Sequence, residues 1–238
     1  MQSAAFTIAL FEFVLLIFSL SFHECAHAWM ASRLGDQTAR LQGRVTLNPM
    51  YHVDPVGTLL FPAIAIFGPF LGLGAFSGML IGWARPTPVT SRNFQKIRRD
   101  ENLVTLAGPA SNLLLALVAL VILLGVSHLV PSGREIVVYT FRGVLLPGVN
   151  SSIQALVLLA VAAIEINLSL FFFNLFPIPP LDGSRLVRNM LPYNAIQTYD
   201  RIGGSWISWI LMIFVGGSIL RMLLFPVLGF ILVLLARF

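Results

Sequence analysis

The sequence is poor in charged residues and in cysteine. Asp, Glu, Lys and Arg make up 11% of its 238 residues, whereas soluble domains carry about 25%. Hydrophobic residues make up 57% of the chain. This balance excludes a cytosolic globular enzyme, a disordered segment and a soluble nucleic-acid-binding protein, because each of these needs a polar surface facing water. The single cysteine, Cys25, excludes a disulfide within the chain.

Long apolar runs indicate a membrane protein instead. They occupy residues 4–22, 57–82, 103–130, 153–178 and 205–236. About 20 apolar residues make one helical crossing, so we expect one all-α polytopic domain over residues 1–238 with five to six transmembrane helices. Gly68 and Pro69 interrupt the second run, which fits a re-entrant segment as well as a complete span. The number of crossings in the last run stays open.

Two polar segments have the pattern of extended chain. Residues 38–47 alternate loosely between apolar and polar side chains, and Pro86 and Pro88 hold residues 84–89 open. Such segments near a bilayer must bury their backbone in protein or line a wet cavity. We therefore expect short membrane-associated β-strands at both places.

The first apolar run leads directly into the motif HExxH. On a helix His23 and His27 share one face and can bind one metal ion, while Glu24 lies beside them as a general base. A solvated loop is the weaker interpretation, because the motif continues an apolar run in which each ionisable group is costly. Catalytic zinc usually takes three protein ligands. The third ligand stays open among these residues: His52, Asp54, His128, Asp182 and Glu165.

A second motif resembles a signature of the site-2 proteases, which are intramembrane zinc metallopeptidases. Residues 174–183 read NLFPIPPLDG, which is similar to the family pattern NxxPxPxLDG. With HExxH and the run AGPASN at residues 107–112, the resemblance covers residues 1 to about 200. It is greatest to the short prokaryotic branch without PDZ or CBS domains.

The resemblance implies a zinc site and its catalytic residues. It assigns one Zn²⁺ per chain to three ligands: His23, His27 and Asp182. It implies that Glu24 activates the attacking water and that Asn112 and Asn174 lie near the cleft. Either amide is a candidate to steady the oxyanion of the substrate. His52 is a candidate auxiliary ligand.

Without the resemblance, Asp182 has two interpretations of equal weight. The three prolines between residues 177 and 180 end a regular helix, so the chain can turn the Asp182 carboxylate toward a metal. Gly183 then lets the backbone pass close to its neighbours. Alternatively, Asp182 is the N-cap of a short helix that begins at Ser184.

The distribution of basic residues predicts an orientation. Loops 31–55, 84–101 and 179–204 carry eleven Lys and Arg residues, against two in loop 131–152. Cytoplasmic loops are enriched in Lys and Arg, and a re-entrant 57–82 would place all three basic loops on one side. We therefore expect a multi-pass protein of the cell (inner) membrane, with its active site toward the cytoplasm.

These patterns predict an intramembrane zinc metalloprotease. Its expected partners are the lipid bilayer and membrane-protein substrates with a transmembrane helix, cut within or near that helix, and no nucleic acid. The two extended segments are candidates to bind an unwound substrate by edge addition. The alternative is a membrane zinc-binding transporter or a proteolytically inactive relative, neither of which needs Glu24 for chemistry.

Overall fold

The computed structural model describes residues 2–73, 84–203, 205–206, 212 and 216–237. Its long helices are α1 (Gln2–Arg33), α4 (Ile97–Leu129), α6 (Ser151–Asn174) and α10 (Gly217–Arg237). The shorter α-helices are α2 (Thr38–Leu41), α3 (Phe61–Phe67), α5 (Gly133–Phe141), α7 (Asp182–Met190) and α8 (Tyr193–Gly203). Tight helical turns complete the described elements: η1 (Pro49–Tyr51), η2 (Pro55–Leu60), η3 (Gly68–Leu71) and η5 (Ser91–Asn93).

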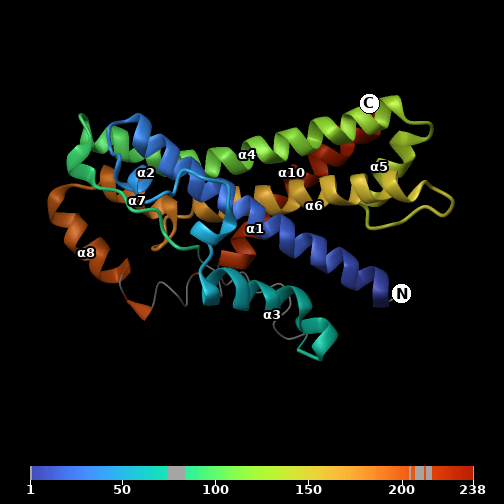
Figure 1. Ribbon diagram of the computed structural model, residues 1–238, viewed down its shortest axis with the longest axis horizontal. Coiled ribbons are helices and arrows are strands. Elements are labelled where there is room, and N and C mark those ends of the chain that lie inside the picture. Colours follow the sequence, from blue (N-terminus) through green and yellow to red (C-terminus); the bar gives the residue numbers. More distant parts are fainter. Residues whose placement is uncertain (1, 74–83, 204, 207–211, 213–215, 238) are drawn as a thin grey trace.

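Four helices in the described part of the chain, α1, α4, α6 and α10, are long and apolar enough to cross a membrane. The prediction of five to six transmembrane helices is therefore wrong. Figure 1 shows the four helices running along the length of the molecule, with the N-terminus of α1 and the C-terminus of α10 at one end. The C-terminal ends of α1 and α6 lie at the opposite end, beside α2, α7 and α8.

The apolar run 57–82 accounts for part of the difference. Its described part belongs to one shorter apolar helical stretch, Pro55–Leu71, which is interrupted at Gly68 and stops where Gly72 adopts a positive φ of 76°. That conformation suits glycine and ends a helix. The return of the predicted re-entrant segment falls on residues 74–83, outside the described residues.

The predicted β-strands are also wrong, since no strand occurs among the residues that the structure describes. Residues 38–41 form the helix α2. Residues 84–90 are irregular chain whose N–H groups bond outside any ladder. The N–H of Arg85 donates to the His52 carbonyl at 2.9 Å, and the N–H of Thr90 donates to the Asp36 carboxylate at 2.7 Å. Pro86 and Pro88 have no N–H to offer a partner strand.

The main apolar core lies at the end of the molecule that holds α5. There α4, α5, α6 and α10 pack together through fully buried side chains, among them Leu123, Val137, Val157, Ile164 and Leu235. A smaller cluster of Ala31, Phe94 and Val104 joins the end of α1 to the start of α4. The main core holds α4, α5, α6 and α10 together. The smaller cluster holds the end of α1 against the start of α4, where the polar segments lie.

Asp36 attaches the 84–90 segment to the end of α1. Its buried carboxylate accepts hydrogen bonds from the Thr38 hydroxyl at 2.5 Å, the Thr90 N–H at 2.7 Å and the Asn93 amide at 2.8 Å. Burial by itself would raise the pKa of Asp36, but these hydrogen bonds hold it below its ordinary value. The charged carboxylate therefore stabilises this connection.

We expect Asp36→Asn to reduce thermal stability in a pH-dependent way. Because the folded pKa of Asp36 is lowered, its contribution is present above the unfolded pKa and is lost as the pH falls through the folded pKa. The difference in Tm between wild type and variant, measured in detergent, should be largest near about pH 7 and shrink below about pH 4. A difference that stays constant across this range would contradict this role.

Candidate metal centre

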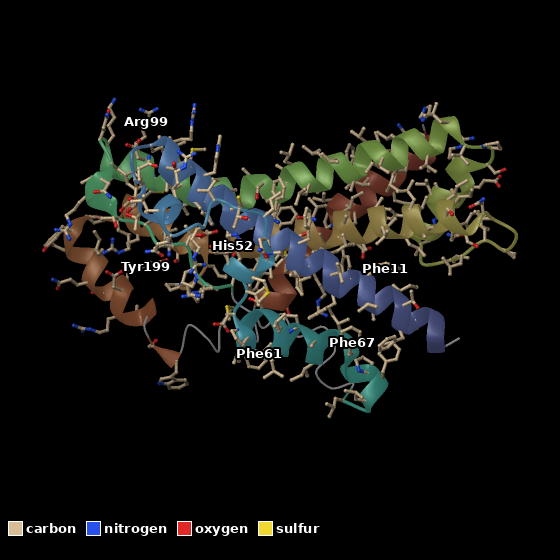
Figure 2. The ribbon with its side chains drawn as sticks, in the orientation of Figure 1. Phe11, His52, Phe61, Phe67, Arg99 and Tyr199 are labelled. Atoms are coloured by element: carbon tan, nitrogen blue, oxygen red, sulfur yellow. The ribbon has the colours of Figure 1, made fainter. Side chains whose placement is uncertain are left out.

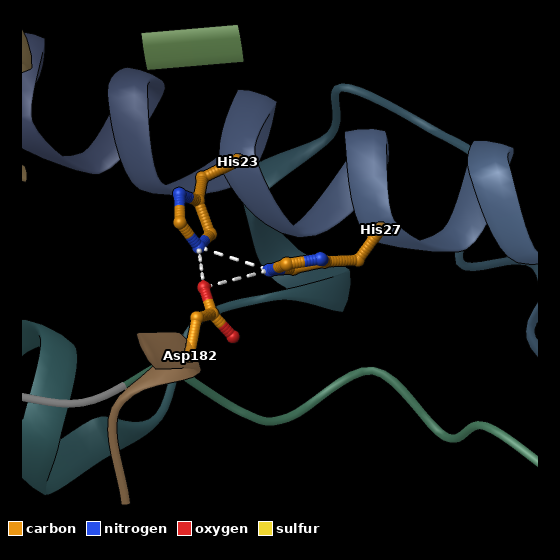
Figure 3. A group of neighbouring side chains, drawn as sticks. All are labelled: His23, His27 and Asp182. Atoms are coloured by element: carbon orange, nitrogen blue, oxygen red, sulfur yellow. Dashed lines mark hydrogen bonds and ion pairs between the residues drawn. The ribbon is translucent and has the colours of Figure 1, made fainter. Parts of the chain in front are cut away.

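Three ligand atoms from two helices converge at one point. His23 and His27 lie one turn apart on α1, and both are buried. Their Nε2 atoms are 3.0 Å apart, and the Oδ2 atom of Asp182 lies 3.1 Å from one and 3.2 Å from the other. Figure 3 shows the two imidazoles turned toward the Asp182 carboxylate.

Asp182 reaches the histidines from the first residue of α7. The preceding residue, Leu181, is the N-cap, and no side chain caps the helix, so the alternative of an Asp182 N-cap does not hold in the structure. Gly183 allows the close approach, because a Cβ there would lie 2.1 Å from the Leu175 carbonyl oxygen. The start of α7 therefore packs directly against the end of α6.

The hydrogen bonds at the other ring nitrogens orient both imidazoles. The Nδ1 of His23 lies 2.6 Å from the Oδ1 of Asn112, and the Nδ1 of His27 lies 2.7 Å from the Val104 carbonyl oxygen. Oxygen acceptors at both positions place the protons on Nδ1 and leave the Nε2 lone pairs facing Asp182. Donation from Nδ1 to an oxygen acceptor is the usual arrangement of metal-bound histidines.

A buried chain of side chains supports His23. The Asn112 amide donates to the Asn167 side-chain oxygen at 2.9 Å, and the Asn167 amide donates to the Ser19 hydroxyl at 3.0 Å. Asn112, Asn167 and Ser19 are almost fully buried and come from α4, α6 and α1. Sequence reasoning missed Asn167, although a lone asparagine in an apolar run is the kind of signal that could have found it.

The space between the histidines depends on Gly108 of α4. A Cβ at this position would lie 2.3 Å from the Nε2 of His27 and 2.5 Å from the Nε2 of His23. Only glycine leaves room there for an atom between the ligands. This room, bordered by three acceptor atoms, is where a cation fits.

The donor set fits zinc. Donors bonded at 2.0–2.1 Å to a tetrahedral ion lie about 3.3 Å apart, close to the 3.0–3.2 Å separations in this cluster. Burial would raise the pKa of Asp182, but the neighbouring histidines hold it well below its ordinary value. An ionised carboxylate with two imidazoles is a common catalytic zinc set, and the fourth position stays open for water.

Glu24 lies beside the cluster and is held by the 84–90 segment. The Thr87 N–H donates to the Oε2 of Glu24 at 3.1 Å, and the Thr87 hydroxyl donates to the same oxygen at 2.8 Å. Both bonds use one carboxylate oxygen, so the other is available for a water molecule. Sequence reasoning did not foresee this contact, because it joins residues 63 positions apart.

The remaining candidates lie outside the three-atom cluster. The Asn174 amide donates to the Leu170 carbonyl of its own helix at 3.0 Å. His52 is buried and donates from Nε2 to the Thr46 carbonyl at 2.8 Å. Asp54 caps η2, and His128 bonds the Leu124 carbonyl. Within the described residues, the group able to hold a metal consists of His23, His27 and Asp182.

Comparison with known proteins agrees with this site. The family model described as "Peptidase family M50" matches residues 11–216. "Putative zinc metalloprotease YwhC" of Bacillus subtilis (strain 168) is 37% identical over 179 residues, which cover 75% of this chain and 68% of that protein. "Putative zinc metalloprotease Rip2" of Mycolicibacterium smegmatis is 32% identical over 167 residues, which cover 70% of this chain and 52% of that protein.

The chain belongs to peptidase family M50, because the match spans most of its length. The resemblance to site-2 proteases drawn from the two motifs is thereby confirmed. No solved structure matches the chain significantly.

We expect Gly108→Ala to abolish metal binding. The added methyl group would occupy the space between the two Nε2 atoms, and the helix backbone that carries it cannot move away cheaply. Gly125→Ala, on the same helix with nothing within 4 Å of its Cβ, is the matched control and should keep full zinc content. Zinc per chain, measured by elemental analysis of purified protein, checks both. Full zinc in Gly108→Ala would contradict this role of Gly108.

Proposed function

We propose that His23, His27 and Asp182 bind the zinc ion of an intramembrane metalloprotease and that Glu24 is its general base. Membership of family M50 and relatives named as zinc metalloproteases give the zinc-dependent peptidase activity. The observation that carries the assignment of residues is the convergence of three acceptor atoms beside Glu24. A zinc ion held there would polarise the scissile carbonyl and make a water molecule nucleophilic at neutral pH.

Each residue of the chain then has a defined task. The free carboxylate oxygen of Glu24 takes a proton from the attacking water and passes it to the nitrogen of the leaving amine. Thr87 keeps the carboxylate in one orientation through its two hydrogen bonds. General acid–base catalysis of this kind typically contributes 10²- to 10⁴-fold to a rate.

The asparagines divide between positioning and substrate contact. Both ends of the Asn112 amide are engaged, by His23 and by Asn167, so we assign Asn112 to positioning the ligand rather than to the oxyanion. Asn174 stays as the candidate oxyanion donor, since its amide is bonded only to a carbonyl of its own helix within the described residues. We give His52 no role in binding zinc, because its Nε2 is bonded to a carbonyl away from the cluster.

The substrates are membrane-embedded proteins, as expected for a membrane peptidase of this family. We propose that the cleaved bond lies within or near a transmembrane helix that partly unwinds at the site, because a helical peptide bond is shielded by its own backbone. The transporter alternative loses support. Such a protein would need neither Glu24 nor the Thr87 contact that fixes its carboxylate.

We propose that the metal centre faces the cytoplasm of the cell membrane. It lies at the end of the bundle with α2, α7 and α8, where Arg99 and Tyr199 also lie (Figure 2). Basic residues concentrate in the loops at this end, as the positive-inside rule requires of cytoplasmic loops. Single cysteines introduced at Arg92 and at Arg142 should be labelled from the cytoplasmic and external sides respectively, and the reverse result would contradict this orientation.

The decisive test of catalysis replaces Glu24 alone. We expect Glu24→Gln to retain one zinc per chain and to cleave a single-span reporter at least about 10²-fold more slowly, because glutamine cannot accept the proton. Glu135→Gln, the same substitution in α5 at the far end, should cleave like wild type. Cleavage by Glu24→Gln at the wild-type rate would refute the role of Glu24 as general base. Loss of zinc from this variant would refute the claim that Glu24 is not a zinc ligand.

A further inference from the structure

A polar cavity of about 300 Å³ opens beside the metal centre. One wall is the extended segment that holds Glu24, another is the beginning of α4, and the third is α7. Thr87 and Val104 connect this cavity to the site, because Thr87 bonds Glu24 and the Val104 carbonyl accepts from His27. The cavity therefore lies next to residues that contact two members of the site, Glu24 and His27.

The extended wall has the side-chain spacing of a strand without being one. Thr87 and Val89 line the cavity from the extended segment, because alternate residues of extended chain point to the same side, and Ser91, the first residue of η5, adjoins them. Pairing with this wall through the backbone is limited, since Pro86 and Pro88 lack N–H groups. Contact with an occupant must come mainly from side chains.

The helical walls lead away from the metal. On α7, Arg185 and Asn189 stand three and seven residues beyond Asp182 and line the cavity on the same face. At 1.5 Å per residue, this row extends about 10 Å from the ligand. An extended peptide covers about 3.3 Å per residue, so the cavity matches roughly three residues on one side of the cut.

The two arginines that line the cavity from α7 differ in whether they have an ion-pair partner. Arg188 makes a two-pronged contact with Asp200 at 2.9 and 3.0 Å, so its charge is already balanced. Arg185 lines the same cavity, is exposed, and has no hydrogen bond or ion pair with any described residue. One acidic side chain, Glu101, lines the cavity from α4, and its charge interacts with that of Arg188. Arg185 is thus the cation left for an occupant.

We propose that this cavity binds the substrate segment next to the cleaved bond and that Arg185 selects an acidic side chain there. The proposal rests on the proposed function and names its substrate class: membrane proteins with Asp or Glu one or two residues from the cut. Arg185 lies one helical turn from Asp182, which gives that spacing. An Arg–carboxylate pair adds specificity through two parallel hydrogen bonds.

The preference of Arg185 for an acidic side chain disfavours most membrane helices as substrates and favours a few. Cytoplasmic ends of membrane helices are enriched in Lys and Arg, and a like charge against Arg185 is repelled. A basic cavity at a basic end of the bundle thus protects ordinary helices from cleavage. Acidic flanks are uncommon there, so they mark a small class of substrates.

The test uses purified full-length, zinc-loaded protein in detergent. Three single-span reporters carry Glu, Gln or Lys at each of the two positions beside the cut. Wild type should cleave the Glu reporter about tenfold faster in kcat/KM than the Lys reporter, with the Gln reporter between them. Arg185→Gln should abolish the preference, and Arg185→Glu should invert it.

Two controls separate selection from damage. The Gln reporter should be cleaved equally by wild type and by Arg185→Gln, which shows that the catalytic centre is intact. Arg201→Glu, an equal charge reversal on α8 outside the cavity, should leave all three rates in the wild-type ratio. The Glu24→Gln protein should bind a fluorescent Glu-flanked peptide more tightly than its Lys-flanked counterpart, without turnover.

The outcomes distinguish the two levels of the argument. If wild type cleaves all three reporters equally, or if Arg185→Glu keeps the wild-type ratio, the proposal for Arg185 is wrong while the protease stands. If wild type cleaves none and Glu24→Gln binds none, both the proposed function and the selection fail. Inversion by Arg185→Glu, with zinc content unchanged, supports both.

Discussion

Two imidazole nitrogens and one carboxylate oxygen meet at separations of 3.0–3.2 Å, and the rest of the structure serves this contact. Three acceptor atoms so close repel one another unless a cation lies among them. The fold must therefore hold them rigidly and leave space between them. Gly108 provides the space, Gly183 brings α7 close enough, and the partners of the two Nδ1 atoms fix the rings.

The apolar bilayer explains why the buried polar side chains behind His23 are hydrogen-bonded to one another. A polar group left unsatisfied in the hydrocarbon region is costly, so Asn112, Asn167 and Ser19 pair with one another across α4, α6 and α1. The same bonds join the three helices at the depth of His23. Away from this point the bundle packs mainly through apolar side chains, such as Leu123 and Ile164. The bundle around His23 thus depends on particular polar partners, whereas the rest of the bundle depends on apolar packing.

The sequence was most informative where chemistry follows local spacing. HExxH on a helix predicts the shared face of His23 and His27, which the structure shows, whereas the approach of Asp182 depended on the family resemblance. The contacts of Thr87 and Asn167 could not be assigned, because their partners are 63 and 148 positions away, although the lone Asn167 in an apolar run could have been singled out as a candidate. The number of spans was overestimated in part because the described portion of the run 57–82 belongs to the shorter helical stretch Pro55–Leu71, and the interruption at Gly68 and Pro69 did not by itself decide between a full span and a shorter segment.

The error over β-strands bears on how a substrate is recognised. Extended chain becomes a strand only when its N–H groups are free to form a ladder. In the 84–90 segment, Arg85 and Thr87 already donate to His52 and Glu24, and Pro86 and Pro88 cannot donate at all. A substrate lying beside this segment would find few backbone partners. Specificity must then come from side chains around the cavity, and there an unpaired cation discriminates more strongly than apolar contact.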